Sequence, residues 1–233
     1  MKISLFFIPE LSLGKRNVKD ARLDQVDKIT RAKKKTYLQV ELAGEEGAAD
    51  ADAILAAKEA AADLILKDLE FVENRISRAT QEEEKALLLK FKETLEKESF
   101  ISSLELASEE VRLISSYSLL TKRPVVTASK EELGDTDSLL GRVLRESGYI
   151  SFFTTGEKET RAWLIRCGST AWEAAGAIHS DIQKGFIRAE IIALEDFLSC
   201  GGETPAKQAG KMRLEGKDYI MQDCDLANFR FNK

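Results

Sequence analysis

The chain has 233 residues, of which 43 % are hydrophobic and 32 % charged, and its formal net charge at pH 7 is -5. This composition is typical of a globular protein with one large or two small domains, and it excludes a largely disordered or low-complexity chain. Its apolar runs are shorter than the roughly 18 residues of a membrane-spanning helix, and its first ten residues lack a secretory signal, so we expect a cytoplasmic protein without a membrane partner.

The charge is divided between two blocks of opposite sign. Residues 14–36 carry nine basic and three acidic side chains, a net charge of +6, whereas residues 45–110 carry eighteen acidic and eight basic ones, a net charge of -10. Because an acidic surface repels phosphate backbones, only the first block favours a nucleic acid. It contains Lys33, Lys34 and Lys35, for which a solvated loop before a strand is the alternative.

The first hundred residues predict an α/β unit followed by two long helices. Residues 2–8 and 36–42 are rich in β-forming side chains and predict strands. Residues 50–79 contain no glycine or proline and predict one long helix with the apolar spacing of a coiled coil. This stripe consists of Ile65, Leu69, Val72, Ile76 and Ala79. Thr80 and Glu83 have the spacing of a capping box, which predicts a second helix and hence an antiparallel hairpin.

The pattern changes at Gly148. Before it, residues 108–120 predict a helix with Val111 inward, residues 124–127 a strand, and residues 135–147 a helix that Gly148 ends. After it, short β-rich runs alternate with short helical segments. The runs are residues 149–155, 160–165, 186–192, 218–221 and 226–231. The sequence therefore predicts an α/β part with a helical hairpin, followed by a compact α+β module.

The sequence offers no set of neighbouring residues for catalysis or metal binding. His179 is the single histidine, and the three cysteines are 33 and 24 residues apart, so neither a catalytic triad nor a close-spaced metal site is indicated. We expect His179 to be a structural or hydrogen-bonding surface residue. We expect no catalytic residue and no metal site.

Several separated strings in the last 85 residues carry a resemblance to a known family. They are residues 153–163 (FTTGEKETRAW), 174–181 (AAGAIHSD), 184–190 (KGFIRAE), 209–219 (AGKMRLEGKDY) and 229–232 (FRFN). Together they resemble the C-terminal TGS domain of the YchF/Obg-like ATPase family. Upstream, residues 20–24 (DARLD) resemble that family's segment after its first switch region, and the hairpin is placed where the family carries a coiled coil.

This resemblance implies a β-grasp, ubiquitin-like fold for residues 149–233 and contact with the ribosome or RNA. It identifies the chain as a shortened relative of this family. The missing length falls in the nucleotide-binding domain. The expected division is a degenerate G-domain-like base at residues 1–47 and 122–148, a helical hairpin at residues 48–121, and the TGS domain at residues 149–233.

The nucleotide motifs of that family are altered in this sequence. A P-loop needs two glycines, then Lys and Ser or Thr, to bind phosphates and Mg²⁺. Only Gly14 and Lys15 match, with Pro9 at the first glycine position and Arg16 at the hydroxyl position. Little chain separates Arg16 from residues 20–24, which leaves no room for the helix whose N-terminus would face the phosphates. We therefore expect that ATP or GTP hydrolysis is lost and that no cofactor is bound.

Two further nucleotide motifs are also changed. Glu41 stands where the family's Asp-x-x-Gly has its aspartate, and Ser129 stands where a base-reading asparagine is expected. Ser129 and Glu132 are better explained as a capping box. The alternative is that ATP or GTP with Mg²⁺ is still bound, through Gly14, Lys15 and Glu41.

The leading hypothesis is a non-catalytic YchF-like protein that binds the ribosome or RNA. Because residues 149–233 have a net charge of only -1, such binding requires local basic patches. The candidate contacts are Lys33, Lys34, Lys35, Arg161, Arg188, Lys207, Lys211 and Arg213. No DNA partner is expected. A third hypothesis is an adaptor whose helical hairpin binds a protein partner or a second copy.

Overall fold

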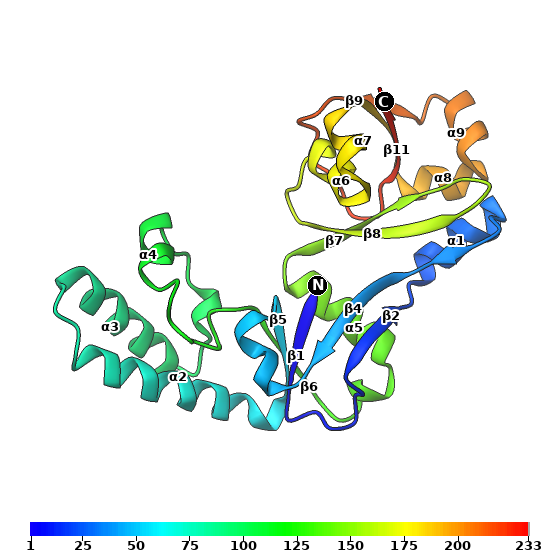
Figure 1. The fold of residues 1–233 in the computed structure, drawn as a ribbon. Helices are drawn as coiled ribbons and strands as arrows, with labels where there is room; N and C mark the ends of the chain where they lie inside the picture. The colour runs from blue at the N-terminus through cyan, green and yellow to red at the C-terminus, as the bar shows by residue number, and fades with distance from the viewer. Residues whose placement is uncertain (233) are drawn as a thin grey trace. The chain divides into compact units, whose positions relative to one another are not determined.

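The first of two sheets has five strands in the order β2-β4-β1-β5-β6 (Figure 1). The structure, a computed structural model, describes residues 1–232. The strands are β1 (Lys2–Phe6), β2 (Gly14–Val18), β4 (Leu38–Ala43), β5 (Ala53–Ala57) and β6 (Val125–Ala128). β1 lies parallel to both β4 and β5, and β5 lies parallel to β6. β1 and β5 are almost entirely buried, as is usual for the central strands of a parallel sheet.

β5 corrects one prediction. The long helix expected over residues 50–79 begins only at Ala61, because Ala53–Ala57 forms a central strand instead. A strand that is buried on both faces shows an unbroken apolar run rather than alternation, and an alanine-rich run of that kind is easily read as helix. The helical periodicity is therefore valid only for the second half of the segment.

The two long helices of the first half pack against each other. They are α2 (Ala61–Ile76) and α3 (Glu82–Glu96), and a short helix, α4 (Ser108–Leu113), follows. The predicted stripe is confirmed: Ile65 and Val72 are buried in the core that α2 shares with α3, and the other three stripe residues pack against it. Four 3₁₀ turns complete this region, at Glu45–Asp50, Lys58–Ala60, Ile101–Ser103 and Glu132–Gly134.

Two details of these helices differ from the predictions. α3 begins after Gln81, which makes no side-chain cap, because turns after α2 extend to Ala79 and leave Thr80 too far from the first helical residue. The predicted capping box of Thr80 and Glu83 is therefore wrong. The helix expected over residues 108–120 stops at Leu113, and Val111 is exposed rather than inward.

The second sheet has six strands in the order β10-β9-β11-β7-β8-β3. They are β3 (Lys35–Thr36), β7 (Tyr149–Thr154), β8 (Thr160–Arg166), β9 (Phe186–Ile192), β10 (Arg213–Glu215) and β11 (Leu226–Phe231). β7 pairs antiparallel with β8 and parallel with β11, and β11 and β10 each pair antiparallel with β9. Four of the five predicted strands are present. Residues 218–221 contribute only an isolated bridge between Thr170 and Ile220.

Helices pack on both faces of this second sheet. The remaining helices are α1 (Ala21–Thr30), α5 (Thr136–Glu146), α6 (Ala171–Ile178), α7 (Ser180–Lys184), α8 (Leu194–Cys200) and α9 (Glu203–Gln208). α6 contributes Ala171, Ala174 and Ala175 to a core with Phe152 and Ile165. On the other face, α1 contacts β8, where the hydroxyls of Thr30 and Thr160 are 2.7 Å apart. Because side chains alternate along a strand, the two helices lie on opposite faces.

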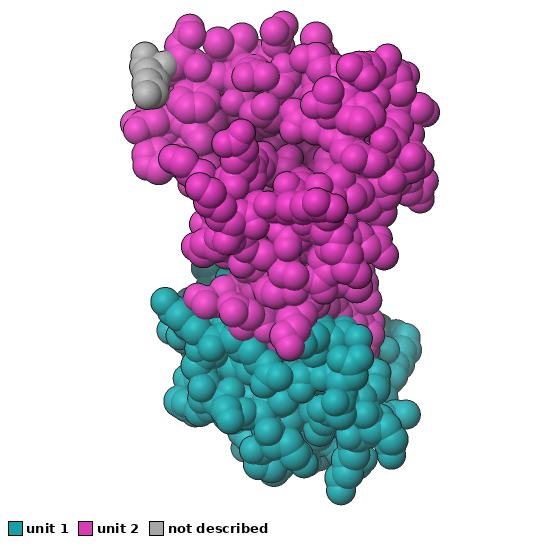
Figure 2. Space-filling model, turned by 90° about the vertical axis from the view of Figure 1, so that its right-hand side faces the viewer, with its two compact units in different colours: residues 1–16, 40–139 teal, residues 17–39, 140–233 magenta. Residues whose placement is uncertain are grey.

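The described chain divides into two compact units (Figure 2). Unit 1 consists of residues 1–16 and 40–139, and unit 2 consists of residues 17–39 and 140–233. Residues 17–39, which the sequence placed with the first sheet, thus pack with the second. Residues 48–121, which the sequence assigned to a separate helical hairpin, belong to the same compact unit as the first sheet and include its strand β5.

A buried carboxylate holds the chain after α4 against α2. Asp68 is 2 % exposed, and its carboxylate accepts hydrogen bonds from the amides of Leu120 and Thr121 at 2.8 and 2.7 Å, and from the Thr121 hydroxyl at 2.6 Å. Thr121 is fully buried. Through these three bonds Asp68 fixes the path of the chain toward β6.

We expect Asp68→Ala to lower the free energy of unfolding by about 2–4 kcal/mol, because it leaves buried donors without an acceptor. Urea unfolding followed by the helical circular dichroism signal measures this change. Glu70→Ala, at an exposed position on the same helix, serves as the control and should be nearly neutral. Equal stability of the two variants would contradict the role assigned to Asp68.

Candidate functional site

The carboxyl ends of the parallel strands are where an open α/β sheet usually binds a ligand. In unit 1, β1 is followed by residues 7–13, which lead directly into β2. β4 is followed by the 3₁₀ turn Glu45–Asp50, and β5 by the turn Lys58–Ala60 and then α2. Within the described residues, therefore, β1 is not followed by a helix.

Gly14 and Lys15 are the first two residues of β2, and both are exposed. Gly14 has φ of 109°, a conformation that favours glycine and lets the chain turn into the strand. In a P-loop, such a pair lies instead at the start of a helix, whose free amides bind the phosphates. The pair is therefore part of a sheet strand here.

The other altered motifs lie at different places in the first sheet. Glu41 is an exposed residue within β4, opposite Lys2 of β1, and is not part of a loop at the carboxyl end of the strand. The carbonyl oxygen of Gly44 accepts a hydrogen bond from the Ser4 hydroxyl at 3.0 Å. The Glu132 carboxylate accepts a hydrogen bond from the Ser129 amide at 2.9 Å, which is one half of the predicted capping box.

The structure brings Lys33, Lys34 and Lys35 beside Arg161, although the sequence gave these as separate candidates. The reason is the parallel pairing of β3 with β8, and the amide of Lys33 also donates a hydrogen bond to the carbonyl oxygen of Glu157 at 3.2 Å. We call these four basic side chains the β3–β8 patch. It lies within unit 2.

Acidic neighbours neutralise part of the β3–β8 patch. Lys35 lies 2.6 Å from the carboxylate of Asp24, a contact that raises the pKa of the lysine. Lys34 lies 3.2 Å from Glu159 but keeps 69 % of its side chain exposed. Lys33 is exposed and makes no ion pair with the rest of residues 1–232. Lys33 and Lys34 are therefore the lysines of the patch that an outside anion can reach.

Arg161 has a different environment from the lysines. Its guanidinium lies 4.0 Å from the centre of the Trp163 ring, and the ring nitrogen donates a hydrogen bond to the Thr154 hydroxyl at 2.9 Å. Its nearest carboxylate, Glu159, is 4.0 Å away. A stacked arginine of this kind is held in a defined orientation.

The remaining basic candidates lie elsewhere in unit 2. Lys211 and Arg213 line a cavity of about 590 Å³. There the Lys211 ammonium lies 3.1 Å from the carboxylate of Asp196, and the Arg213 guanidinium lies 3.6 Å from that of Asp225. Arg188 and Lys207 are exposed residues of β9 and α9, respectively. The eight candidates therefore do not form one continuous surface.

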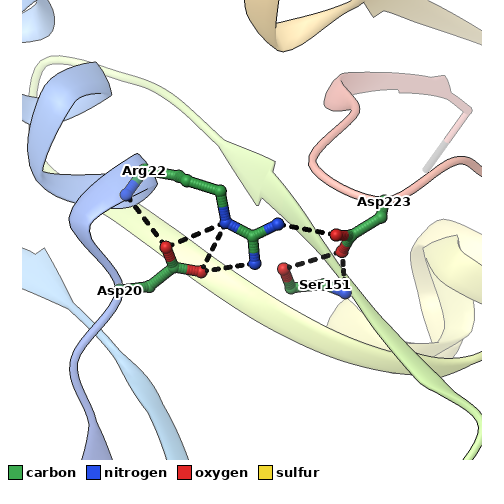
Figure 3. A network of polar contacts seen from close by, with 4 residues as sticks. All are labelled: Asp20, Arg22, Ser151 and Asp223. Carbon is green, nitrogen blue, oxygen red and sulfur yellow. Dashed lines mark hydrogen bonds and ion pairs between the residues drawn. The ribbon is translucent and has the colours of Figure 1, made fainter. Parts of the chain in front are cut away.

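A polar network joins α1 to β7 and to the segment before β11 (Figure 3). Asp20 caps α1 by accepting a hydrogen bond from the Arg22 amide at 2.9 Å, and it also binds the Arg22 guanidinium at 2.8 Å. The same guanidinium lies 2.6 Å from the carboxylate of Asp223. Asp223 in turn accepts hydrogen bonds from the amide and hydroxyl of Ser151 at 3.0 and 3.3 Å.

The charges in this network stabilise one another. The hydrogen bond to Asp20 raises the pKa of Arg22. Burial alone would raise the pKa of Asp223, but hydrogen bonds from Ser151 and Arg22 outweigh it and hold the pKa below 3.8. Burial raises the pKa of the neighbouring Cys224 thiol to about 12, so this thiol is neutral at pH 7. The network thus carries ionised partners but no nucleophile.

Sequence reasoning missed the role of this network. The signal available was residues 20–24, which were noted only as part of a resemblance. Asp223 and Ser151 gave no signal, because their partner lies far away in the sequence. His179 behaves as predicted: it is exposed, and its Nδ1 accepts a hydrogen bond from the Asp181 amide at 3.1 Å.

The part of the chain that the structure describes contains neither a metal-binding cluster nor a membrane-spanning helix. No three His, Cys, Asp or Glu side chains are grouped so that they could hold a metal ion. None of the helices has the length and apolar character of a membrane span.

Comparison with known proteins shows which proteins this chain resembles. Residues 149–232 match the family YchF-GTPase_C, described as a protein of unknown function (DUF933). The protein named Ribosome-binding ATPase YchF from Bacillus subtilis (strain 168) is 35 % identical to this chain over an alignment of 235 positions. The aligned part covers 73 % of this chain. By these matches the chain is similar to the YchF proteins. The resemblance noted in the sequence is thereby confirmed.

Two further comparisons support this relationship. The YchF protein of the same name from Haemophilus influenzae is 36 % identical over 233 residues, again covering 73 % of this chain. The chain spans 64 % of the length of each of these two YchF proteins. A solved structure, described as the Schizosaccharomyces pombe YchF GTPase, matches with a TM-score of 0.77 at 20 % identity, covering 99 % of this chain and 97 % of that one. This last match shows the mixed α/β fold with two sheets.

We expect Arg22→Met to lower the free energy of unfolding of unit 2 by about 1 kcal/mol. The value is modest because the side chains of Arg22 and Asp223 are about one third exposed, so water screens their interaction. The loss should be largest above pH 3.8. Asp223 has a lowered pKa, so its stabilising contribution is present above 3.8 and disappears as the pH falls through the native value.

Urea unfolding at several pH values, followed by the fluorescence of Trp163 and Trp172, measures this effect. Lys158→Met, at an exposed position of the same unit, is the matched control. A difference between Arg22→Met and the natural protein that stays constant down to pH 2 would contradict the assignment.

Proposed function

We propose that this chain is a non-catalytic YchF-type protein that binds the ribosome or RNA and does not hydrolyse ATP or GTP. The observation that carries the proposal is the direct passage from β1 to β2 through residues 7–13. A phosphate group needs several free backbone amides, and the first turn of a helix after β1 is what supplies them in this class of fold. Gly14 and Lys15 lie in β2, where the backbone takes part in sheet pairing.

The proposed ribosome contact follows from the relatives. The proteins from Bacillus subtilis and Haemophilus influenzae are both named ribosome-binding ATPases. Residues 149–232 carry the family match, and we propose that they form the family's β-grasp TGS domain. The pairing of β7 with both β8 and β11, and the packing of α6 on this sheet, support that proposal. A ribosome partner places the protein in the cytoplasm.

Electrostatics favours one place for the contact with RNA. Residues 45–110 have a net charge of -10 and repel phosphate groups. In unit 2, the β3–β8 patch combines two reachable lysines with an arginine stacked on Trp163. Phosphate contacts by lysine and stacking by aromatic or guanidinium planes are the usual elements of RNA binding. We therefore propose the β3–β8 patch as the principal RNA-binding surface.

The first test is nucleotide binding. Isothermal titration of the protein with ATP and with GTP, each with and without Mg²⁺, should show no heat of binding up to about millimolar nucleotide, because the helix start that binds phosphate is missing. Bound nucleotide is first removed from the purified protein. Micromolar, Mg²⁺-dependent binding would overturn the non-catalytic assignment and favour a nucleotide-binding YchF-type protein.

The second test is ribosome cosedimentation. Lys33→Glu with Lys34→Glu should weaken cosedimentation about tenfold and reduce its dependence on salt, because two phosphate contacts are reversed in sign. Lys58→Glu with Lys85→Glu makes the same change of charge at exposed positions of unit 1 and should have little effect. An equal loss in both pairs would show that only net charge matters, and no loss in the first pair would exclude the patch.

A further inference from the structure

A groove of about 480 Å³ lies between α3 and α4 in unit 1. Its lining combines apolar and charged residues, and α3 and α4 each contribute both kinds. The lining residues are Gln81, Glu83, Ala86, Leu87, Lys90, Glu109, Glu110 and Leu113. The groove is separate from the first sheet's strand ends and from the β3–β8 patch.

The spacing of the lining residues explains the shape of the groove. Glu83, Ala86, Leu87 and Lys90 follow the i, i+3, i+4, i+7 pattern, so they form one face of α3 over about two helical turns. Ala86 is exposed and has the smallest side chain on that face. The hollow exists because a methyl group stands where neighbouring positions carry long side chains.

The apolar floor lies beneath an acidic rim. Leu87 is buried and Leu113 is half-buried, and both pack in the core shared by α2, α3 and α4. Among the rim residues, Glu110 lies 3.6 Å from Lys90 and also accepts a hydrogen bond from the Ala107 amide at 2.7 Å. The Glu110 carboxylate therefore already has partners within the chain.

The other two rim carboxylates are different. Glu83 and Glu109 are exposed and make no ion pair with any other side chain among residues 1–232. Each lies in the first turn of its helix, where the helix dipole stabilises a negative charge. The groove thus offers an apolar floor and two uncompensated negative charges.

We propose that this groove binds a short amphipathic helix with a basic polar face, supplied by a protein partner. Apolar side chains spaced three or four residues apart fit the two-turn length of the floor, and lysine or arginine side chains beside them pair with Glu83 and Glu109. This is the helix-in-groove mode of recognition. The negative charge of the surrounding residues 45–110 excludes RNA from the same groove and attracts a basic peptide.

The test uses the full chain and a synthetic probe. The probe is a labelled peptide of about 14 residues that contains only leucine and lysine, with the spacing of an amphipathic helix, and its partner control replaces every lysine by glutamate. Fluorescence polarisation measures the dissociation constant at several salt concentrations. We expect the lysine peptide to bind and the glutamate peptide to fail.

Four variants locate the binding. Glu83→Lys with Glu109→Lys should weaken binding about tenfold, because both rim charges become repulsive. Glu70→Lys with Glu105→Lys makes the same change of net charge at exposed positions outside the groove, and should change binding less than about twofold. Ala86→Trp fills the hollow and should also weaken binding about tenfold, whereas Ala86→Ser should not.

Lys90 provides a change in the opposite direction. Lys90→Ala releases Glu110 and should strengthen binding of the lysine peptide more than Lys85→Ala, which removes an exposed charge of α3 outside the groove lining. Circular dichroism and thermal unfolding of every variant establish that α3 and α4 are intact, so a loss of binding cannot be a loss of fold.

Several outcomes would overturn the proposal. Equal weakening by the two double-lysine variants would show that the peptide responds only to overall charge. Unchanged binding by Ala86→Trp would place the peptide elsewhere, and failure of the lysine peptide to bind the natural chain would exclude the groove. Ribosome cosedimentation and nucleotide titration read different surfaces, so failure here is distinguishable from failure of the proposed function.

Discussion

The direct passage from β1 to β2 constrains what the first sheet can do. Parallel strands bring their carboxyl ends to one edge, and the loops at that edge determine whether a phosphate finds free amides. Here residues 7–13 connect β1 to the edge strand β2 without forming a helix. Gly14 is then needed for its positive φ at the start of β2, and its resemblance to a phosphate-binding glycine is one of sequence alone.

The second sheet depends on a segment from the first forty residues. β3 adds an edge strand to β8, and α1 covers the sheet face opposite α6. Arg22 joins these parts, because its guanidinium binds Asp20 at the start of α1 and Asp223 before β11. The same packing that stabilises unit 2 also assembles the β3–β8 patch, so stability and the proposed RNA contact share one origin.

The distribution of charge gives the two units different partner chemistry. Unit 1 carries 24 of the 40 acidic residues, including Glu83 and Glu109, which have no ion-pair partner among the described residues. In unit 2, acidic neighbours neutralise much of the basic charge, and Lys33 and Lys34 are what an anion can reach in the patch. Phosphate and basic peptides are therefore directed to separate surfaces.

Local patterns in the sequence predict the elements whose signal is local. The apolar spacing of α2, the helix α5 with its stop at Gly148, and strands β7, β8, β9 and β11 were all predicted, because periodicity and turn residues act over a few positions. The resemblance of the last 85 residues to YchF proteins was likewise readable from separated strings.

Other features depend on contacts between distant parts of the chain. Ala53–Ala57 became a strand because it is buried between β1 and β6, a condition that outweighs the helical preference of alanine. The pairing of Lys35 with Thr160 and the bond from Arg22 to Asp223 join residues more than a hundred positions apart. No local pattern records such contacts, because they form between surfaces that exist only after the sheets are assembled.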